Sequence, residues 1–397
     1  MIRGGIVSTV VLLWFSGAAL RVSILAVPPV ITFLRADLAM SATEIGILSG
    51  LPMIMIAAAA IPGSLAIAKF GALHTLVGAL ILAAIGAGLR GFIPDVAALL
   101  VSTTIMSVGI AIAQPALSVL VRQWLPSRIG FGTAAYSNGM IVGCLLPILS
   151  APMLLMLAPG NWRLILASSS LLIFIVAGLL AAFAQHPAEQ THIHNAAIPT
   201  RPPLLDYGLL WRLGLIFGSN NSVFFGTNAF LPLYLVEAGR PELIPTALAI
   251  YNFGQIPSSL LVMAFAGRIE RRIWPYSLAG ALLLSSIVVI WLTADAWMIL
   301  IATATLGFAS GTSLVLGLAL PPLLSEPSDV GRVSAGMFMI SYAFAMIVSV
   351  ICGFASDLTG DTRSALMLIA ISILPLLLLP PTIQFNRSTH RVARGPS

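Results

Sequence analysis

Residues 6–33 read IVSTVVLLWFSGAALRVSILAVPPVITF, and this stretch decides the fold because it is apolar throughout except for a single charge, Arg21. At the helical rise, Arg21 lies roughly 22 Å along a span whose hydrocarbon surroundings are about 30 Å thick. A guanidinium at that depth costs at least about 2.5 to 3.5 kcal/mol, so it should face protein or water and hold something negative. The stretch therefore predicts a membrane-spanning helix with a candidate anion site.

The composition of the whole chain fits a lipid environment. Hydrophobic residues make up 59% of the 397 residues, charged residues make up 8%, and the mean hydropathy is +1.04. A water-soluble protein of this length could not keep such a composition away from its surface. Because every backbone polar group inside a bilayer must be paired within the protein, the long apolar stretches are expected to be helices. We predict an all-α integral membrane protein.

Charges, prolines and glycines divide the chain into twelve apolar stretches, each long enough to cross a bilayer. We expect a six-helix bundle over 1–184, a polar cytoplasmic loop over 185–207, a second six-helix bundle over 208–390 and a cytoplasmic tail over 391–397. The twelve predicted spans are 6–34, 44–69, 73–92, 95–122, 130–158, 163–184, 208–236, 243–267, 274–294, 296–324, 331–356 and 363–384.

The basic residues predict the orientation of the chain. Of the nineteen Lys and Arg residues, thirteen fall on the side that holds both termini. The positive-inside rule therefore places both termini in the cytoplasm, with the chain in the cell inner membrane. The sequence pI near 9.9 follows from this topology and implies no nucleic-acid partner. The five basic residues expected on the outer side are Arg35, Arg90, Arg163, Arg240 and Arg363, and we interpret Arg90, Arg122 and Arg212 as snorkelling at span ends.

The two halves show internal similarity of the kind that gene duplication leaves in transporters. LPMIMIAAAAIPGSLAIAKFG (51–71) in span two and NFGQIPSSLLVMAFAGRIERR (252–272) in span eight both place a mid-helix proline and small residues before a basic turn. GIAIAQPALSVL (109–120) in span four and GTSLVLGLALPPLL (311–324) in span ten share a proline after a stretch that a glycine begins. Two similar six-helix bundles are the simplest interpretation.

The chain resembles the major facilitator superfamily, and within it the cyanate permease and 2-nitroimidazole transporter group, over nearly its whole length. The resemblance implies twelve transmembrane helices in two bundles and a carrier of small anions or small polar molecules. It rests on LRVSILAVPPVITFLRADLAMSATEIGILSGLP (20–52), QPALSVLVRQWLPSRIGFGTAAYSNGMIVG (114–143), NWR (161–163) and NSVFFGTNAFLPLYLVEAG (221–239).

Departures from the superfamily pattern count against multidrug efflux. The loop after span two reads SLAIAKFGAL (64–73). Ala68 stands where the superfamily pattern usually has an acid, and Ala72 and Leu73 stand where it usually has a basic pair. Span four has no charge between Asp95 and Arg122, where drug exporters of the superfamily tend to carry an Arg. A proton-antiporting exporter of drugs or hydrophobic compounds stays the alternative function, since the many aromatic and Met residues would permit an apolar pocket.

Every acid and all five histidines fall at span ends or in loops. Proton-driven carriers generally need a titratable carboxylate or histidine at membrane depth. We therefore expect that any proton coupling is carried by the substrate or by a residue at the rim, and that the protein is otherwise a facilitator or an exchanger.

Helical phase selects the candidate substrate-binding residues. In span seven, Asn221, Phe224, Phe225 and Asn228 recur at i, i+3, i+4 and i+7, which puts two amides and two rings on one face. An amide stripe facing lipid would leave hydrogen bonds unmade, so it should point inward. Around one guanidinium, neutral donors suit a small anion or a carboxylate with a polar body. The other candidates are Tyr251, Asn252 and Gln255 in span eight, Gln114 in span four, Tyr136 and Asn138 in span five, and Tyr342 in span eleven.

Each candidate has a structural alternative. Arg21 could serve packing, although intramembrane charge is functional by default. The amides could join helices to one another, and the aromatic residues could be packing residues. Glycines such as Gly139 and Gly143 are interpreted as sites of close helix packing. The two cysteines, Cys144 and Cys352, are interpreted as small packing residues.

We predict a secondary active or facilitative transporter that works by alternating access, with residues 1–184 rocking against 208–390 around a site at the membrane midplane. Arg21 would be the anion anchor, and the amides of spans seven and eight would orient the substrate. The partners expected are a small, anionic substrate and the lipid bilayer, with the protein a monomer. No motif of a metal site, a nucleophile beside a base or a phosphate loop is present, so we expect no enzyme activity, no metal and no cofactor.

Overall fold

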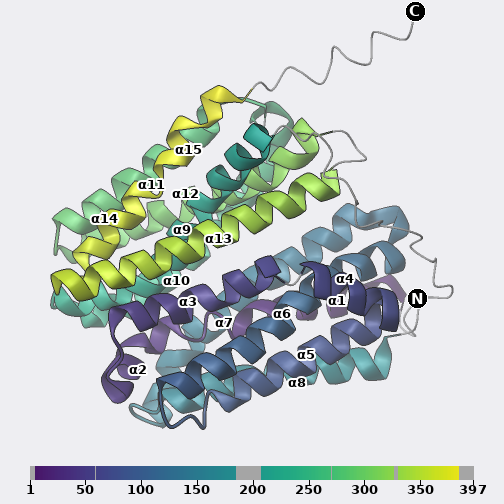
Figure 1. Cartoon of the computed structure of the whole chain (residues 1–397), viewed down its shortest axis with the longest axis horizontal. Coiled ribbons are helices and arrows are strands. Elements are labelled where there is room, and N and C mark those ends of the chain that lie inside the picture. Colours follow the sequence, from purple (N-terminus) through teal and green to yellow (C-terminus); the bar gives the residue numbers. More distant parts are fainter. Residues whose placement is uncertain (1–4, 59, 185–206, 270, 326–329, 384–397) are drawn as a thin grey trace, which may run out of the picture. The chain divides into compact units, whose positions relative to one another are not determined.

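The computed structural model describes residues 5–58, 60–184, 207–269, 271–325 and 330–383, and the regular elements of these residues are all helices (Figure 1). The α-helices are α1 Gly5–Val22, α2 Ile31–Leu38, α3 Ala42–Ala58, α4 Ala60–Phe70, α5 Ala72–Leu89, α6 Val96–Trp124, α7 Ile129–Leu157, α8 Trp162–Phe183, α9 Tyr207–Glu237, α10 Ile244–Ile269, α11 Trp274–Leu292, α12 Ala296–Leu324, α13 Val330–Thr359, α14 Arg363–Ile371 and α15 Leu374–Leu378. Short 3-10 turns are η1 Pro28–Val30, η2 Pro126–Arg128, η3 Pro241–Leu243 and η4 Pro380–Thr382.

Each of the twelve predicted spans contains helix, but the spans do not each correspond to one helix. In the described part of the chain, nine helical segments are long and apolar enough to cross a membrane. The first and last spans are each divided between separate helices, and the second contains α3 and α4 on either side of residue 59. In the first, the consecutive prolines Pro28 and Pro29 have no backbone N–H to continue the α-helical ladder, and in the last Pro375 follows the break at Ser372 and Ile373. The predicted all-α membrane fold is confirmed, and the structure adds breaks within the first and last predicted spans.

The outer surface of the helices is apolar to an extent that water would not allow. Met156 of α7 is 83% exposed, and Leu358 of α13 is 76% exposed. Extensive exposed apolar surface marks contact with a membrane or another apolar partner. Together with the nine apolar helical segments, it identifies a multi-pass membrane protein.

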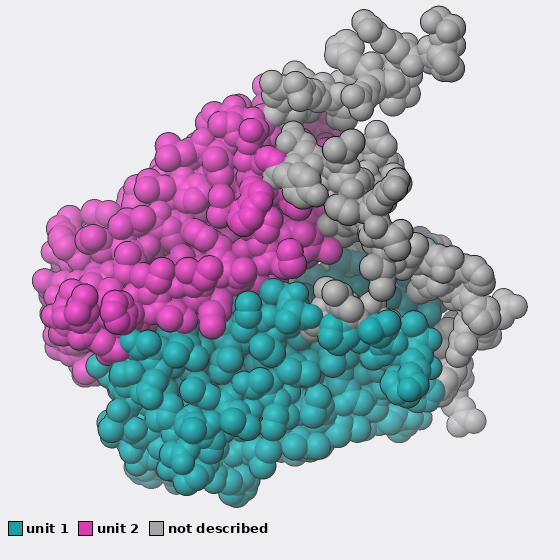
Figure 2. All heavy atoms as spheres, viewed as in Figure 1, with its two compact units in different colours: residues 1–203 teal, residues 204–397 magenta. Residues whose placement is uncertain are grey.

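The chain divides into two compact units, residues 1–203 and residues 204–397 (Figure 2). Within the first unit, α1 packs on α7, α3 packs on α6, and α5 packs on both α6 and α8. Within the second unit, α9 packs on α13, α10 packs on α12, and α11 packs on both α12 and α14. In span order this is one scheme used twice, because the first helix pairs with the fifth, the second with the fourth, and the third with the fourth and sixth.

Glycines allow the closest of these helix contacts in the first unit. A Cβ on Gly139 would overlap the main-chain carbonyl of Trp14, and a Cβ on Gly143 would overlap the carbonyl of Ala18. On the facing helix, a Cβ on Gly17 would overlap the carbonyl of Tyr136. We refer to this contact, formed by Gly17 and Ala18 of α1 with Gly139 and Gly143 of α7, as the α1–α7 seam. The interpretation of Gly139 and Gly143 as close-packing residues is confirmed.

Candidate anion-binding site

Arg21 lies in the last turn of α1, one turn beyond the α1–α7 seam. Trp14, Gly17, Ala18 and Arg21 follow one another at i, i+3, i+4 and i+7, so the face of α1 that packs on α7 also carries Arg21. Leu20 and Val22 on either side of it are buried, whereas Arg21 keeps part of its surface accessible. The Cys144 thiol of α7 lies within the range of electrostatic interaction with the Arg21 guanidinium. Arg21 is therefore held at the end of a rigid helix contact with its guanidinium partly free.

Tyr136 and Asn138, both predicted site residues, lie on the α7 side of this contact. The indole N–H of Trp14 donates a hydrogen bond of 2.8 Å to Oδ1 of Asn138, and the main chain of Tyr136 faces Gly17. Asn138 is exposed and Tyr136 is partly exposed. The structure thus brings the span-one and span-five candidates onto one pair of helices, with Asn138 already engaged by Trp14.

No carboxylate neutralises Arg21 among the residues that the structure describes. The two ion pairs found there are Arg163 with Asp37 at 2.6 Å and Arg240 with Glu242 at 3.8 Å. Each described acid lies within three residues of a helix end or in a connection, as the sequence predicted. A guanidinium without a carboxylate partner remains available to bind an anion.

The amides of the second unit make hydrogen bonds to neighbouring helices. Asn221 donates to the Ser341 hydroxyl of α13 at 3.2 Å, and Asn252 of α10 donates to Oδ1 of Asn228 at 3.0 Å. Asn228 in turn donates to the carbonyl of Phe224 at 2.8 Å. All three amides are at least 95% buried. These contacts support the interpretation of Asn221, Asn228 and Asn252 as links between helices.

The aromatic candidates of the second unit pack around the same amides. Phe224 makes an edge contact with Phe225, with ring centroids 5.0 Å apart, and lies 6.1 Å from the ring of Tyr251. Tyr251 is fully buried and Tyr342 is 5% exposed, stacked against Phe338. Among the described residues, neither Gln255 nor Gln114 makes a side-chain hydrogen bond to a neighbouring helix. Gln255 is 8% exposed, and Gln114 is partly exposed beside Pro115 in α6.

Arg90 does not snorkel, and this part of the sequence interpretation is wrong. Its side chain is 1% exposed, and its Nη2 donates a hydrogen bond of 2.7 Å to the main-chain carbonyl of Ser23. Arg90 caps α5, whereas Ser23 directly follows the end of α1. The guanidinium therefore points into the first unit and reaches the break in the first span.

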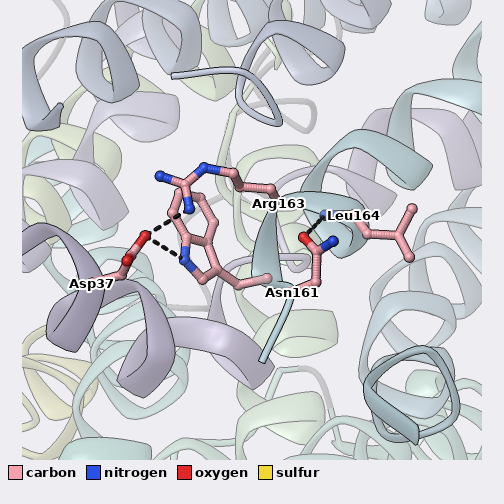
Figure 3. Close-up of polar contacts among 5 residues, drawn as sticks. Asp37, Asn161, Arg163 and Leu164 are labelled. Carbon is pink, nitrogen blue, oxygen red and sulfur yellow. Dashed lines mark hydrogen bonds and ion pairs between the residues drawn. The ribbon is translucent and has the colours of Figure 1, made fainter. Parts of the chain in front are cut away.

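At the predicted outer end, each unit ties its first span to its sixth through an acid. Asp37 of α2 accepts hydrogen bonds from Arg163 at 2.6 Å and from the indole N–H of Trp162 at 3.1 Å (Figure 3). The Arg163 guanidinium also lies over the Trp162 ring, 4.3 Å from its centroid. The hydrogen bonds from Arg163 and Trp162 lower the pKa of Asp37 below its ordinary value.

The second unit has the matching contact between α9 and α14. Glu237 accepts a hydrogen bond of 2.8 Å from the backbone N–H of Thr362 and one of 2.6 Å from the Thr362 hydroxyl. Thr362 is the residue before the first turn of α14, so this carboxylate lies at a helix N-terminus, where negative charge is stabilised. We refer to the Asp37 and Glu237 contacts together as the acid clamps.

Sequence reasoning missed Arg90 although a signal for it was present. Ala79, Ala83 and Gly86 lie on the face of α5 that packs on α6, where they contact Gly109, Ser102 and Met106. Arg90 follows Gly86 by four residues, on the same face. Its closeness to a span end favoured the snorkelling interpretation, whereas the phase of the small residues indicates an inward direction.

Comparisons with known proteins agree with this architecture. A family model of the Major Facilitator Superfamily matches residues 13–244. The 2-nitroimidazole transporter of Escherichia coli (strain K12) is 24% identical over 370 residues, which cover 90% of this chain and 90% of that protein. The cyanate transport protein CynX of the same organism is 25% identical over 372 residues, covering 93% of this chain and 94% of that protein.

Solved structures share the fold at lower identity. The inward-open xylose transporter XylE from E. coli aligns with a TM-score of 0.74 and 15% identity, covering 96% of this chain and 97% of that chain. A bacterial homologue of the human lysosomal transporter Spinster, in an inward-facing unoccupied conformation, aligns with a TM-score of 0.76 and 14% identity, covering 94% and 95% of the two chains. At these identities the likeness concerns the fold alone.

Proposed function

The chain belongs to the Major Facilitator Superfamily, and we propose that this membrane transporter carries a small anion or a small polar organic solute, with Arg21 as the anion anchor. The observation that carries the proposal is the position of Arg21. It is the charge at the end of the α1–α7 seam, partly accessible, with no carboxylate against it among the described residues. A charge kept at such depth is costly and is retained where it serves transport.

The names of two relatives support the same substrate class. Cyanate is a small anion, and 2-nitroimidazole is a small polar heterocycle. Either would be bound by a guanidinium together with neutral hydrogen-bond donors. Tyr136, Asn138 and Gln114 are the candidates of the first unit for hydrogen bonds to such a solute; Tyr136 and Gln114 are partly exposed and Asn138 is exposed. Gln255, Phe224 and Tyr342 are the corresponding candidates of the second unit.

Charge neutralisation at Arg21 supplies a mechanism for alternating access. A buried unpaired guanidinium is expensive to desolvate, and a bound anion removes most of that cost. Occlusion of the site is therefore favoured when substrate is bound, because the anion binds the occluded state more tightly than it binds the open state. The empty protein should interconvert slowly, so exchange of substrate should be faster than net flux. Since the described acids lie at helix ends, we propose no carboxylate at membrane depth for proton coupling.

Several further expectations from the sequence belong to this proposal. They are a monomer in the cell inner membrane with both termini in the cytoplasm, and no enzyme activity or cofactor. The charge distribution supports the orientation, and the family supports the transport role.

The proposal is tested by ligand-induced thermal stabilisation of the purified full-length protein. Wild type, Arg21→Gln and Arg21→Lys are compared across cyanate, nitrite, small carboxylates, neutral nitroheterocycles and cationic drugs. Arg35→Gln is the matched control, because Arg35 is a partly exposed Arg of α2 at the other end of the same span. We expect one anion class to stabilise wild type and Arg35→Gln, to stabilise Arg21→Lys weakly, and not to stabilise Arg21→Gln.

A different result would favour the alternative function. If cationic or hydrophobic compounds stabilise wild type and Arg21→Gln equally, and no anion does, Arg21 is a structural residue. Efflux of drugs or hydrophobic compounds would then replace anion transport as the function.

A further inference from the structure

The first span is discontinuous next to the proposed anion anchor. α1 ends at Val22, residues 23–27 form turns, and η1 begins at Pro28. The last turn of any helix leaves main-chain carbonyls without helical partners, and inside a membrane these carbonyls need other donors. The break therefore needs a hydrogen-bond donor from another helix.

Arg90 supplies that donor. Its Nη2 donates a hydrogen bond of 2.7 Å to the carbonyl of Ser23. The next residue, Gly91, lies so close to α8 that a Cβ there would be 2.7 Å from the Cβ of Ala167. With 1% of its surface exposed, Arg90 lies buried at the end of α5, a helix that packs on α8, and reaches the break that follows α1. Because the donating guanidinium is buried, this single bond from Nη2 fixes the position of the Ser23 carbonyl relative to the end of α5.

Packing alone does not account for a charged residue in this place. In the described structure, Nε of Arg90 and the hydroxyl of Ser23 are both buried and have no hydrogen-bond partner. Burying a cation with part of its donors unpaired is costly, and an apolar residue of similar size would avoid that cost. The cost is understandable if the positive charge and its bond to the helix end have a task in transport.

We propose that Arg90 is a positioning residue for Arg21: by holding the Ser23 carbonyl, it fixes where α1 ends and thereby aims the Arg21 guanidinium at the anion. This inference rests on the proposed function, since it needs Arg21 to be the anion anchor. Ser23 follows Arg21 by two residues, and the backbone N–H of Leu25 still bonds the carbonyl of Arg21 at 3.2 Å. A shift of the Ser23 carbonyl is therefore transmitted directly to the turn that carries Arg21.

The charge of Arg90 has a second consequence for the same site. Both guanidiniums are near the C-terminal end of α1, where the helix dipole presents partial negative charge and offsets some of their mutual repulsion. The two charges together raise the positive potential around this end of α1. Neutralising Arg90 should accordingly weaken anion binding even though Arg90 itself is too buried to touch the substrate.

The test compares Arg90→Gln, Arg90→Lys, Ser23→Ala and Arg163→Gln with wild type in the full-length protein. Hydrogen–deuterium exchange of the peptide covering residues 19–30 reports the break directly, and cyanate uptake into proteoliposomes gives KM and kcat. For Arg90→Gln we expect faster exchange in that peptide and a KM raised about tenfold, the effect of losing one charge-assisted hydrogen bond. Arg90→Lys should recover part of both, because an ammonium can still donate to the carbonyl.

Two of the variants are controls. Ser23→Ala removes a hydroxyl that has no partner and leaves the carbonyl in place, so exchange and KM should stay within about twofold of wild type. Arg163→Gln removes an exposed Arg at the start of α8 and should leave the peptide unchanged. Should Arg90→Gln fail to fold, Arg90→Lys carries the comparison, with raised KM and faster exchange than wild type as the expected result.

The outcomes separate this inference from the proposed function. If Arg21→Gln abolishes cyanate binding but the Arg90 variants keep wild-type KM and exchange, the positioning role is wrong and anion transport stands. If Arg90→Gln speeds exchange but KM is unchanged, Arg90 is only structural and the inference is overturned. If Arg21→Gln leaves anion binding intact, the proposed function itself fails.

Discussion

The two units use one scheme of helix pairing but fill it differently. In the first unit, α1 and α7 touch main chain to main chain at Gly17, Gly139 and Gly143, and a charge follows one turn beyond this contact. In the second unit, the corresponding helices α9 and α13 meet mainly through side chains, and no main-chain approach among the described residues there is as close as those in the α1–α7 seam. Asn221 follows Gly218 by three residues, as Arg21 follows Ala18. Duplication thus explains the packing, whereas the first unit alone carries intramembrane charge among the described residues.

In both units the outer end of the third helix is tied to the first span by a side-chain hydrogen bond, but the side chains differ in charge. In the first unit, Arg90 of the third span reaches the first span and bonds the Ser23 carbonyl. In the second unit, Tyr234 of the seventh span reaches the ninth, and its hydroxyl lies 2.7 Å from the carbonyl of Ile290 and 3.1 Å from that of Thr293. A neutral tyrosine can tie an unbroken helix to its neighbour. The broken first span is instead tied by a cation, which indicates a role for charge in the first unit.

The largest effect is expected from adding a methyl group to the α1–α7 seam. Gly139→Ala puts a Cβ against the carbonyl of Trp14, so it should lower the free energy of unfolding by about 2 to 3 kcal/mol. Gly218→Ala should cost about 1 kcal/mol or less, because its Cβ meets the movable ring of Phe344 at 3.0 Å. Unfolding in a detergent titration measures both. Gly178→Ala, with open space around it, is the control, and equal losses for Gly139→Ala and Gly218→Ala would remove the contrast between the units.

The amide pair of the second unit comes next. Asn228→Ala and Asn252→Ala should each lower stability by about 1 to 2 kcal/mol, because each leaves a buried polar group of its partner short of a bond. In a double-mutant cycle the two should be coupled by about 0.6 kcal/mol. Cyanate affinity, from thermal stabilisation, should change less than about twofold if these amides link helices. Wild-type stability with lost binding would instead make the amides substrate ligands.

A smaller effect is expected at the acid clamp of the second unit. Glu237→Gln keeps an acceptor for Thr362 but removes the negative charge at the start of α14, so it should cost about 0.5 to 1 kcal/mol at low salt. Thermal unfolding at low and high salt measures it. The loss should shrink at high salt, and a loss independent of salt would mean that the charge has no part in the contact.

The smallest effect is expected at Asp37 and should depend on pH. Its pKa is lowered by the Arg163 and Trp162 hydrogen bonds, so its contribution to stability is present above the pKa of an unfolded Asp, near 3.9. That contribution is lost as the pH falls through the lower, folded pKa. The melting temperatures of wild type and Asp37→Asn should therefore differ at pH 7 and converge below about pH 4. A gap that widens on acidification would reverse the assigned direction of the shift.

The fold could be predicted from the sequence because its signals are long and redundant. Twelve apolar stretches and a polar connector each predicted the same helical membrane protein, and the similarity of spans two and eight and of spans four and ten predicted the repeated packing. The break in the first span was not predicted, although Pro28 and Pro29 are visible in the sequence. A proline can kink a helix or end it, and the outcome depends on whether another helix supplies a donor, here Arg90.

The candidate site was predictable in part. The depth of Arg21 followed from counting residues, and the structure places it on the face of α1 that packs on α7. It lies about one turn beyond Gly17, which meets the main chain of Tyr136, and about two turns beyond Trp14, which bonds Asn138. The sequence predicted that Asn221, Asn228 and Asn252 point inward, but not what they bind. A buried amide can point inward either to bind solute or to bond a neighbouring helix. Partners such as Ser341 lie far away in sequence, and no local pattern identifies them.

Counterflow in sealed proteoliposomes tests the central claim, that an anion held by Arg21 allows the protein to convert between its states. Vesicles loaded with labelled cyanate are diluted into buffer with or without unlabelled cyanate, using wild type, Arg21→Gln and Arg35→Gln. We expect external cyanate to speed the efflux of label several-fold for wild type and Arg35→Gln and to have no effect for Arg21→Gln. Equal efflux with and without external cyanate in wild type, or undiminished acceleration in Arg21→Gln, would contradict the claim.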